Sequence, residues 1–171
     1  MSDAAPPPSG AGWTYAAGVY TISNGVNVTV RGDNQSPAPS QRRLAVAGSA
    51  TVTLTLDNVS ITDLGSGQTP LLLGIGANVT LILVEGTTNT FTSGFNAAGI
   101  RTTGTTLTIN GTGSLQAAGT GGAGIGGSRG EAGGTLTINS GTIKANGGAG
   151  GAGIGGGFFG AGGAVTISGG T

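Results

Sequence analysis

The sequence predicts an all-β protein, a parallel β-helix or solenoid of about five coils, each with roughly 27–29 residues and three short strands. Three observations predict this fold. Glycine is extreme at 39 residues while proline numbers only 6, which excludes a collagen-like repeat. Short runs of Ile, Leu and Val alternate with threonine, as the residues of half-buried strands do. These runs return at regular intervals along the chain.

The repeat is clearest in the second half of the chain. Thr-Leu-Thr-Ile occupies residues 106–109 and 135–138, and the variant Ala-Val-Thr-Ile occupies residues 164–167. Gly-Ala-Gly-Ile-Gly-Gly begins at Gly122 and again at Gly151. Both motifs return after 29 residues, and two motifs that share one period indicate stacked coils.

The first half of the chain is a looser version of the same repeat. Related motifs at residues 53–56 and 80–83 and the one that starts at Thr106 lie 27 and 26 residues apart. We expect the first coil to start near residues 19–23 and 26–30. The spacing therefore predicts about five coils and a fragment.

Each coil is predicted to hold three strands that are separated by glycine-rich corners. In the first strand, alternation places Leu107 and Ile109 inside and the threonines outside. In the third strand, Ile125 and Ile154 point inward. The second strands are residues 59–62, 114–117 and 142–145.

Stacked coils pair equivalent strands in parallel, so like residues form columns. Leu107, Leu136 and Val165 are expected to form one inner column, and burial of such aliphatic side chains contributes about 1.5–3 kcal/mol each. Amides that stack at a corner can form a hydrogen-bonded ladder. The expected members of such a turn column are Asp57, Asn110, Asn139 and Ser168.

The two ends of the chain differ from its middle. Residues 1–12 are predicted to be a flexible leader, and residues 13–171 to be the β-helix repeats. Trp13 and Tyr15 are expected to begin a first strand or an N-terminal cap. The C-terminal coil is incomplete at Thr171. The sequence therefore predicts either a piece of a longer solenoid or a bare edge that another chain covers, end to end.

Charge and composition exclude several functional classes. Lys plus Arg and Asp plus Glu number 6 each, and this balance argues against nucleic-acid binding, which needs clustered cations. The chain has no histidine and no cysteine, so disulfides, thiolate metal sites and histidine catalysis are absent. The sequence contains no run of about 18 apolar residues, so it predicts no membrane span.

Three segments together resemble a known family: residues 79–91, Ala98-Gly99-Ile100 and residues 107–115. They are similar to the bacterial secreted carbohydrate-binding-domain β-helix family and to Gly-Ala-Gly-Ile-Gly-Gly repeat proteins of bacterial cell surfaces. The resemblance covers residues 19–171 and implies a right-handed β-helix in an extracellular or cell-surface setting, a hand that the general bias of parallel crossovers also favours. It also implies that some relatives bind acidic plant polysaccharide with calcium, but it assigns no binding residue here.

Acidic residues offer two kinds of site. Glycoside hydrolysis needs two carboxylates, and Asp57 and Glu85 are expected near one corner of successive coils. Lyase chemistry needs a basic residue beside a cluster of carboxylates and calcium, but Arg101 and Lys144 stand isolated in the sequence. We therefore expect no enzymatic activity. Calcium prefers several oxygen ligands, which Asp57, Asp63 and Glu85 could supply. Ordinary turn positions are the favoured interpretation of these acids, and no cofactor is required.

Aromatic side chains are the candidate ligand-binding residues. The pair Phe158-Phe159 occupies a corner where the preceding coil has Arg129-Gly130, and a variable corner is a surface loop. The alternative for this pair is packing against a next coil or a neighbouring chain. Phe95 and Trp13 are the other candidates, although Trp13 is better explained as a cap over the first coil.

Outward threonines suggest a third surface. Thr106 and Thr108, with their counterparts in the next coil, form a regular Thr-x-Thr array that resembles the arrays of ice-binding β-solenoids. The array is broken at Ala164 and Ile82, and threonine is also simply a good strand residue.

The leading hypothesis is a non-enzymatic extracellular module of a bacterial surface or secreted protein that serves as a stalk or adhesin and binds polysaccharide. One alternative is a structural solenoid that stacks end to end into fibres. The other alternative is ice binding through the threonine array.

Overall fold

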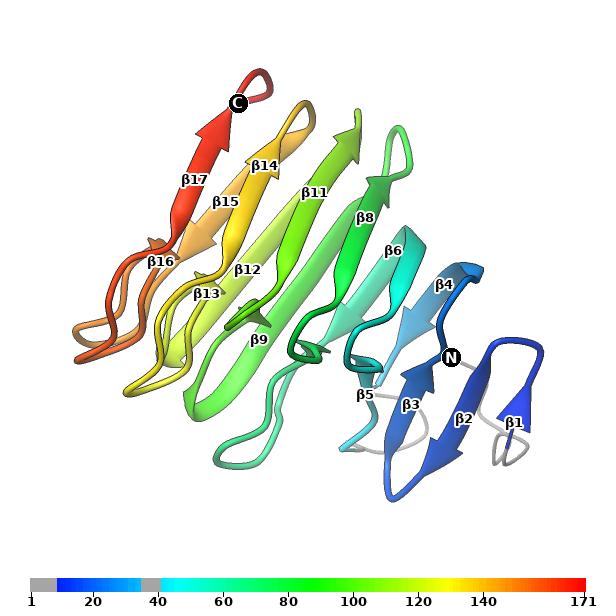
Figure 1. Cartoon of the computed structure of the whole chain (residues 1–171), viewed down its shortest axis with the longest axis horizontal. Coiled ribbons are helices and arrows are strands. Elements are labelled where there is room, and N and C mark those ends of the chain that lie inside the picture. Colours follow the sequence, from blue (N-terminus) through cyan, green and yellow to red (C-terminus); the bar gives the residue numbers. More distant parts are fainter. Residues whose placement is uncertain (1–8, 35–40) are drawn as a thin grey trace.

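The computed structural model describes residues 9–34 and 41–171, and within these ranges the chain forms strands and no helix. Parallel strands stack into a β-solenoid of about five turns, which confirms the predicted fold (Figure 1). Each complete coil has three faces, which the chain visits in the same order. No helix capable of crossing a membrane is therefore found in the described ranges.

The first face is a ladder of short parallel strands joined to an N-terminal hairpin. Its glycine-rich members in the later coils are only two residues long. These strands are β3 (Val19–Ile22), β5 (Arg43–Val46), β7 (Leu71–Leu73), β10 (Ile100–Arg101), β13 (Ile125–Gly126) and β16 (Ile154–Gly155).

The second and third faces hold the longer strands. Strand β6 (Thr51–Ile61) bends round the corner between them, because it pairs with β8 on one face and with β9 on the other. The second face contains β4 (Asn27–Asp33), the start of β6, β8 (Asn78–Leu83), β11 (Thr106–Gly111), β14 (Thr135–Ile138) and β17 (Ala164–Ile167). The third face contains the end of β6, β9 (Thr88–Ala97), β12 (Ser114–Gly121) and β15 (Thr142–Asn146).

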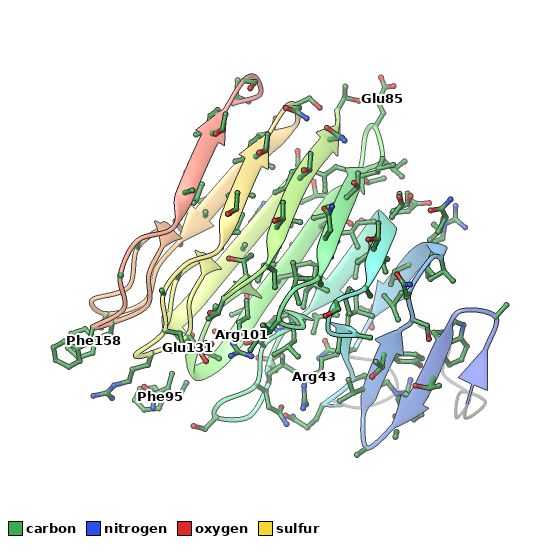
Figure 2. The ribbon with its side chains drawn as sticks, viewed as in Figure 1. Arg43, Glu85, Phe95, Arg101, Glu131 and Phe158 are labelled. Carbon is green, nitrogen blue, oxygen red and sulfur yellow. The ribbon has the colours of Figure 1, made fainter. Side chains whose placement is uncertain are left out.

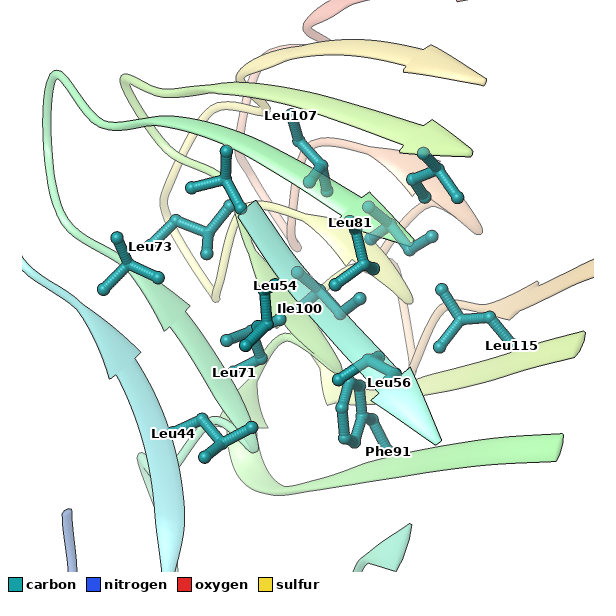
Figure 3. Close-up of a cluster of buried hydrophobic side chains, with 14 of the residues drawn as sticks. Leu44, Leu54, Leu56, Leu71, Leu73, Leu81, Phe91, Ile100, Leu107 and Leu115 are labelled. Atoms are coloured by element: carbon teal, nitrogen blue, oxygen red, sulfur yellow. The ribbon is translucent and has the colours of Figure 1, made fainter. Parts of the chain in front are cut away.

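The core is built from columns of aliphatic side chains. Leu107 pairs with Leu136, and Leu136 pairs with Val165, which confirms the predicted column, although Val165 in the last coil is 43% exposed. Figure 3 shows side chains of the three faces converging on one interior. Fully buried members include Leu71 and Ile100 from the first face, Leu81 and Leu107 from the second, and Phe91 and Leu115 from the third.

Glycine is needed where the backbones of adjacent coils come close. Gly111 has a φ of 93° at the end of β11, a conformation that favours glycine. A β-carbon at this position would collide with the backbone of Leu83 in the preceding coil. The high glycine content is thus partly a consequence of tight corner stacking.

The predicted turn column is only partly correct. The side-chain amide of Asn139 donates to the side-chain oxygen of Asn110 at 2.9 Å, so an amide ladder forms between these two coils. Asp57 does not belong to this column, because Asn110 pairs with Ile82 and Ile82 with Thr55. Asp57 instead lies two positions further along β6 and forms an ion pair with Arg31.

An antiparallel hairpin lies beside the first coil. Strand β1 (Ser9–Gly10) pairs with β2 (Trp13–Ala16), and β2 pairs with β3 in antiparallel orientation. The edge of β3 that faces away from the stack is therefore occupied, as expected of a cap. Residues 1–8 of the predicted leader lie outside the described residues, and the structure places Ser9–Gly10 in a strand.

Candidate functional site

The loops that connect the first face to the second become longer in the last two coils. Residues 47–50, 74–77 and 102–105 make short corners, whereas residues 127–134 and 156–163 make longer loops. The longer loops extend beyond the corners of the earlier coils (Figure 1). We refer to them as the projecting loops, and they carry Arg129, Phe158 and Phe159.

An aromatic groove lies where the second projecting loop meets the end of strand β9. Its volume is about 250 Å³, and Phe95 and Phe158 both lie on its wall. Figure 2 shows these two rings at the same edge of the molecule. The complete lining of the aromatic groove is Phe95, Asn96, Gly121, Arg129, Ala149, Gly150 and Phe158.

Arg129 supplies the charge of the aromatic groove. Its guanidinium carbon lies 5.3 Å from the centroid of the Phe158 ring, which is cation–π geometry. Its Nη1 lies 3.4 Å from the side-chain oxygen of Asn96, to which it donates, and its backbone N–H donates to the Asn96 carbonyl. Arg129 is exposed and has no carboxylate partner among the described residues. The guanidinium is thus oriented but still free to pair with an anion.

The Phe158 ring is held in place by the backbone around it. The carbonyl of Phe158 accepts a hydrogen bond from the N–H of Gly130 at 2.8 Å, which ties together the two projecting loops. The ring lies against Gly150, where any β-carbon would collide with it. Gly150 also has a φ of 75°, so a side chain there would be strained for two reasons. The groove wall is therefore formed before any ligand arrives.

Phe159 is strained and almost fully exposed. Its φ is 63°, a left-handed conformation that bulky residues rarely adopt, and its side chain is 81% exposed. The equivalent residue in the preceding coil is Gly130, whose φ is 78°. The Phe159 ring packs against Phe158 in a tilted arrangement, with the centroids 3.9 Å apart and the planes at 40°. Backbone strain of this kind is concentrated at functional sites in proteins.

A salt bridge anchors the first projecting loop to the stack. Both carboxylate oxygens of Glu131 accept hydrogen bonds from Arg101 on β10, each at 2.6 Å. The backbone N–H of Ser128 and the hydroxyl of Thr103 also donate to this carboxylate. Partial burial raises the pKa of Glu131, but the hydrogen bonds and charge of Arg101 outweigh it, so the pKa lies below its ordinary value of 4.5. Arg101, which stands isolated in the sequence, is thus paired in the fold.

The structure brings together some of the predicted ligand-binding residues. Phe95 and Phe158 share the aromatic groove, and Phe159 lies beside it. Trp13 is in the N-terminal hairpin, where its ring centroid lies 5.5 Å from that of Tyr20, far along the stack from the groove (Figure 1). Sequence reasoning did not select Arg129 as a site residue, although the 29-residue period aligns it with Phe158.

The three predicted metal ligands do not form one group, although Asp57 and Glu85 come just after the paired residues Leu56 and Leu83, at the expected corner. Asp57 is ion-paired with Arg31, and Asp63 lies at the next corner, where it accepts from the hydroxyl of Thr62. Glu85 is exposed in the turn after β8, at the opposite edge from the aromatic groove (Figure 2). Across the described ranges, no group of three or more acidic side chains could hold a metal ion.

Fold and groove together define a parallel β-solenoid with an aromatic-lined groove beside its projecting loops. Comparisons with protein-family models, with curated proteins and with solved structures found no match to this chain.

Proposed function

We propose that the chain is a non-enzymatic module of a bacterial surface or secreted protein, a stalk or adhesin that binds polysaccharide in the aromatic groove. The observation that carries this proposal is the convergence of Phe95, Arg129 and Phe158 from separate coils on one hollow. The stack holds these side chains at fixed positions, and rigid placement lowers the entropy cost of binding.

Two aromatic rings suit a sugar. The face of an aromatic ring carries partial negative charge, which attracts the weakly positive C–H groups on one side of a sugar ring. Phe95 is 59% exposed, so much of its surface is available for such contact. A volume of about 250 Å³ is below the ~300–1,000 Å³ of pockets that enclose drug-sized ligands. The groove would therefore hold one or two sugar units of a longer chain.

Arg129 favours an acidic polysaccharide over a neutral one. A guanidinium pairs with a carboxylate through two parallel hydrogen bonds, as the uronic acids of acidic polysaccharides would allow. No carboxylate lines the groove, so nothing there repels such a ligand. The absence of carboxylates from the lining also means that the groove itself offers calcium no charged ligand.

The test is binding to a panel of neutral and acidic polysaccharides, with calcium and with a chelator. We expect retention on an acidic class in both conditions. Phe95→Ala and Phe158→Ala should each weaken binding by about tenfold, which corresponds to about 1.4 kcal/mol. Arg129→Gln should weaken binding to acidic polysaccharide most and should reduce its dependence on salt.

Ile75→Ala is the matched control, because Ile75 is 69% exposed but lies at the corner between β7 and β8. This variant should bind like the unmodified protein. Equal binding by the Phe158→Ala and Ile75→Ala variants would refute the groove as the site. Binding that disappears with the chelator would place the site at acidic residues elsewhere.

A further inference from the structure

The outward side chains of the second face form a regular array of threonines. The pairing of strands places one threonine of each strand in the same column, across five consecutive coils. The members of this column, which we call the central threonine column, are Thr53, Thr80, Thr108, Thr137 and Thr166. The Thr-x-Thr motifs cover only a part of it.

A second column flanks the central threonine column at the start of the strands. Thr51, Thr106 and Thr135 belong to it, with Asn78 and Ala164 at the other two levels. Strands β8, β11, β14 and β17 contain no charged residue. Figure 1 shows these four strands as neighbouring parallel arrows. The surface they present is therefore uncharged, with one threonine column that repeats at every level of the stack and a second that is threonine at three of five levels.

The hydroxyl groups of these columns are not used by the protein. Threonines at other places bond to the chain, as Thr87 does to the Val84 carbonyl and Thr105 to the Thr102 carbonyl. Within the described residues, no hydroxyl of the two columns donates or accepts a hydrogen bond. Every hydroxyl of this face is thus available to water.

The spacing of these hydroxyls is set by the β-sheet. Neighbouring strands lie about 4.8 Å apart, and alternate residues along a strand lie about 6.6 Å apart. Threonine is branched at its β-carbon and therefore has few side-chain rotamers, so each hydroxyl and methyl group keeps its place. Both repeat distances are in the range of the oxygen–oxygen repeats on the surfaces of an ice crystal.

An open hollow of about 320 Å³ adjoins the flanking column. The hydroxyl-bearing residues Thr106 and Thr135 line it together with glycines of the corners. Water therefore has access to the flanking column along this edge of the face.

We propose that this threonine face binds a solid water lattice, the surface of an ice crystal, as a function separate from polysaccharide binding. The ordered hydroxyl and methyl groups hold surface water at positions that match the lattice. Between attached protein molecules, the ice surface can advance only by bulging outward, and a curved ice surface is less stable than a flat one. The temperature at which the crystal grows is therefore lowered below its melting temperature.

The experiment measures the gap between the melting and growth temperatures of single ice crystals, and their shape, over a range of protein concentrations. The full chain should give faceted crystals and a gap that widens with concentration. Thr108→Lys, at the middle of the central column, should reduce the gap by about fivefold or more. Ile82→Thr, which adds a hydroxyl in register with Thr55 and Asn110, should widen it.

Thr90→Lys is the matched control, because it makes the same substitution on a different face. Thr90 lies in β9 on the third face, where it pairs with Gln116. Its gap should equal that of the unmodified chain, and circular dichroism should show that both lysine variants are folded. Round crystals that grow at the melting temperature would overturn the proposal. So would equal losses in the Thr108→Lys and Thr90→Lys variants.

Discussion

Phe159 shows how a single residue can trade stability for exposure. Its left-handed backbone costs on the order of 1 kcal/mol in a non-glycine residue. Its ring gains little from burial, since the side chain is 81% exposed. The ring does, however, pack against Phe158 and so restricts the movement of the groove wall. We therefore expect Phe159 to serve ligand binding at the expense of folding stability.

Phe159→Gly should raise the free energy of unfolding by about 1 kcal/mol, because glycine adopts this φ without strain. Urea denaturation measures the change. Polysaccharide binding should weaken, because the Phe158 ring loses the ring that packs against it. The converse substitution is Gly130→Ala at the equivalent position, which should lower the stability by a similar amount. A less stable Phe159→Gly variant would show that the turn is not strained.

Individual inner residues could be predicted from the sequence, whereas some corner residues could not. Leu107 and Leu136 were assigned correctly because strand alternation and a constant period determine both face and column. Asp57 was misplaced because the similar motifs at residues 53–56 and 106–109 are not in register: Thr53 pairs with Thr80, and Thr80 pairs with Thr108, two residues beyond Thr106. Separately, Asn58, at a φ of 58°, is an additional residue that β4 leaves unpaired, and nothing in the sequence marks this bulge.

At the scale of an element, the first projecting loop depends on one anchor. Residues 127–134 are rich in glycine and have little apolar surface to bury. The Arg101–Glu131 pair, with its additional bonds from Ser128 and Thr103, therefore accounts for much of the order of the loop. The anchor also fixes Arg129, which lies between Ser128 and Glu131 in the chain.

Glu131→Gln should lower the free energy of unfolding by about 1–2 kcal/mol at pH 7, because two charge-assisted hydrogen bonds weaken in a partly exposed setting. The lowered pKa of Glu131 means that the folded state binds this proton less tightly than the unfolded chain does. Its stabilising effect is complete above the ordinary pKa of 4.5 and is lost as the pH falls through the lower folded-state value.

Thermal melts of Glu131→Gln and the unmodified chain from pH 7 to pH 2 test this dependence. The difference in melting temperature between the two proteins should shrink as the pH falls below about 4.5, because the Glu131 carboxylate then becomes protonated and its stabilising effect is lost. Glu85→Gln is the control, since this exposed turn residue should change stability by less than about 0.5 kcal/mol. A difference that persists at pH 2 would mean that the Glu131→Gln variant loses stability for steric reasons and not through the lost charge.

The elements themselves were predictable, but this anchor and the groove were not. Three strands in each coil follow from periodicity alone. The structure has three in each coil from β7 to β15, whereas β6 covers two faces as one continuous strand. Arg101 and Glu131 are 30 residues apart, outside any short motif. Phe95 reaches the aromatic groove because β9 and β12 pair with a register shift near their ends. A repeat of constant length in the sequence does not predict such a register shift.

The whole molecule is stabilised by contacts between neighbouring coils. Leu81 is fully buried at the centre of the stack, with paired residues in the coils on either side. Leu81→Ala should therefore lower the free energy of unfolding by about 2–5 kcal/mol, which chemical denaturation measures. Ile82→Ala, at the adjacent outward position of the same strand, should cost much less. Equal losses would contradict the assignment of inner and outer faces.

The N-terminal hairpin bears on end-to-end association, which is one of the alternatives that the sequence leaves open. Strand β2 is antiparallel to β3 and occupies the edge that a second copy would need for continuous parallel pairing. A fibre that continues the solenoid in register would have to displace β2. Sedimentation at increasing concentration, with electron microscopy for filaments, tests this alternative directly, and we expect no filaments.

The strict register of the later coils has a consequence at the level of the gene. Leu107, Leu136 and Val165 repeat at 29-residue intervals and lie directly above one another. Duplication of a segment of 29 codons would therefore insert one complete coil, with every inner contact above and below it preserved. An insertion of a different length within a strand would shift the inward residues out of register. Such an array can lengthen only in whole-coil steps, and each step adds another threonine row to one surface and another projecting loop to a neighbouring corner.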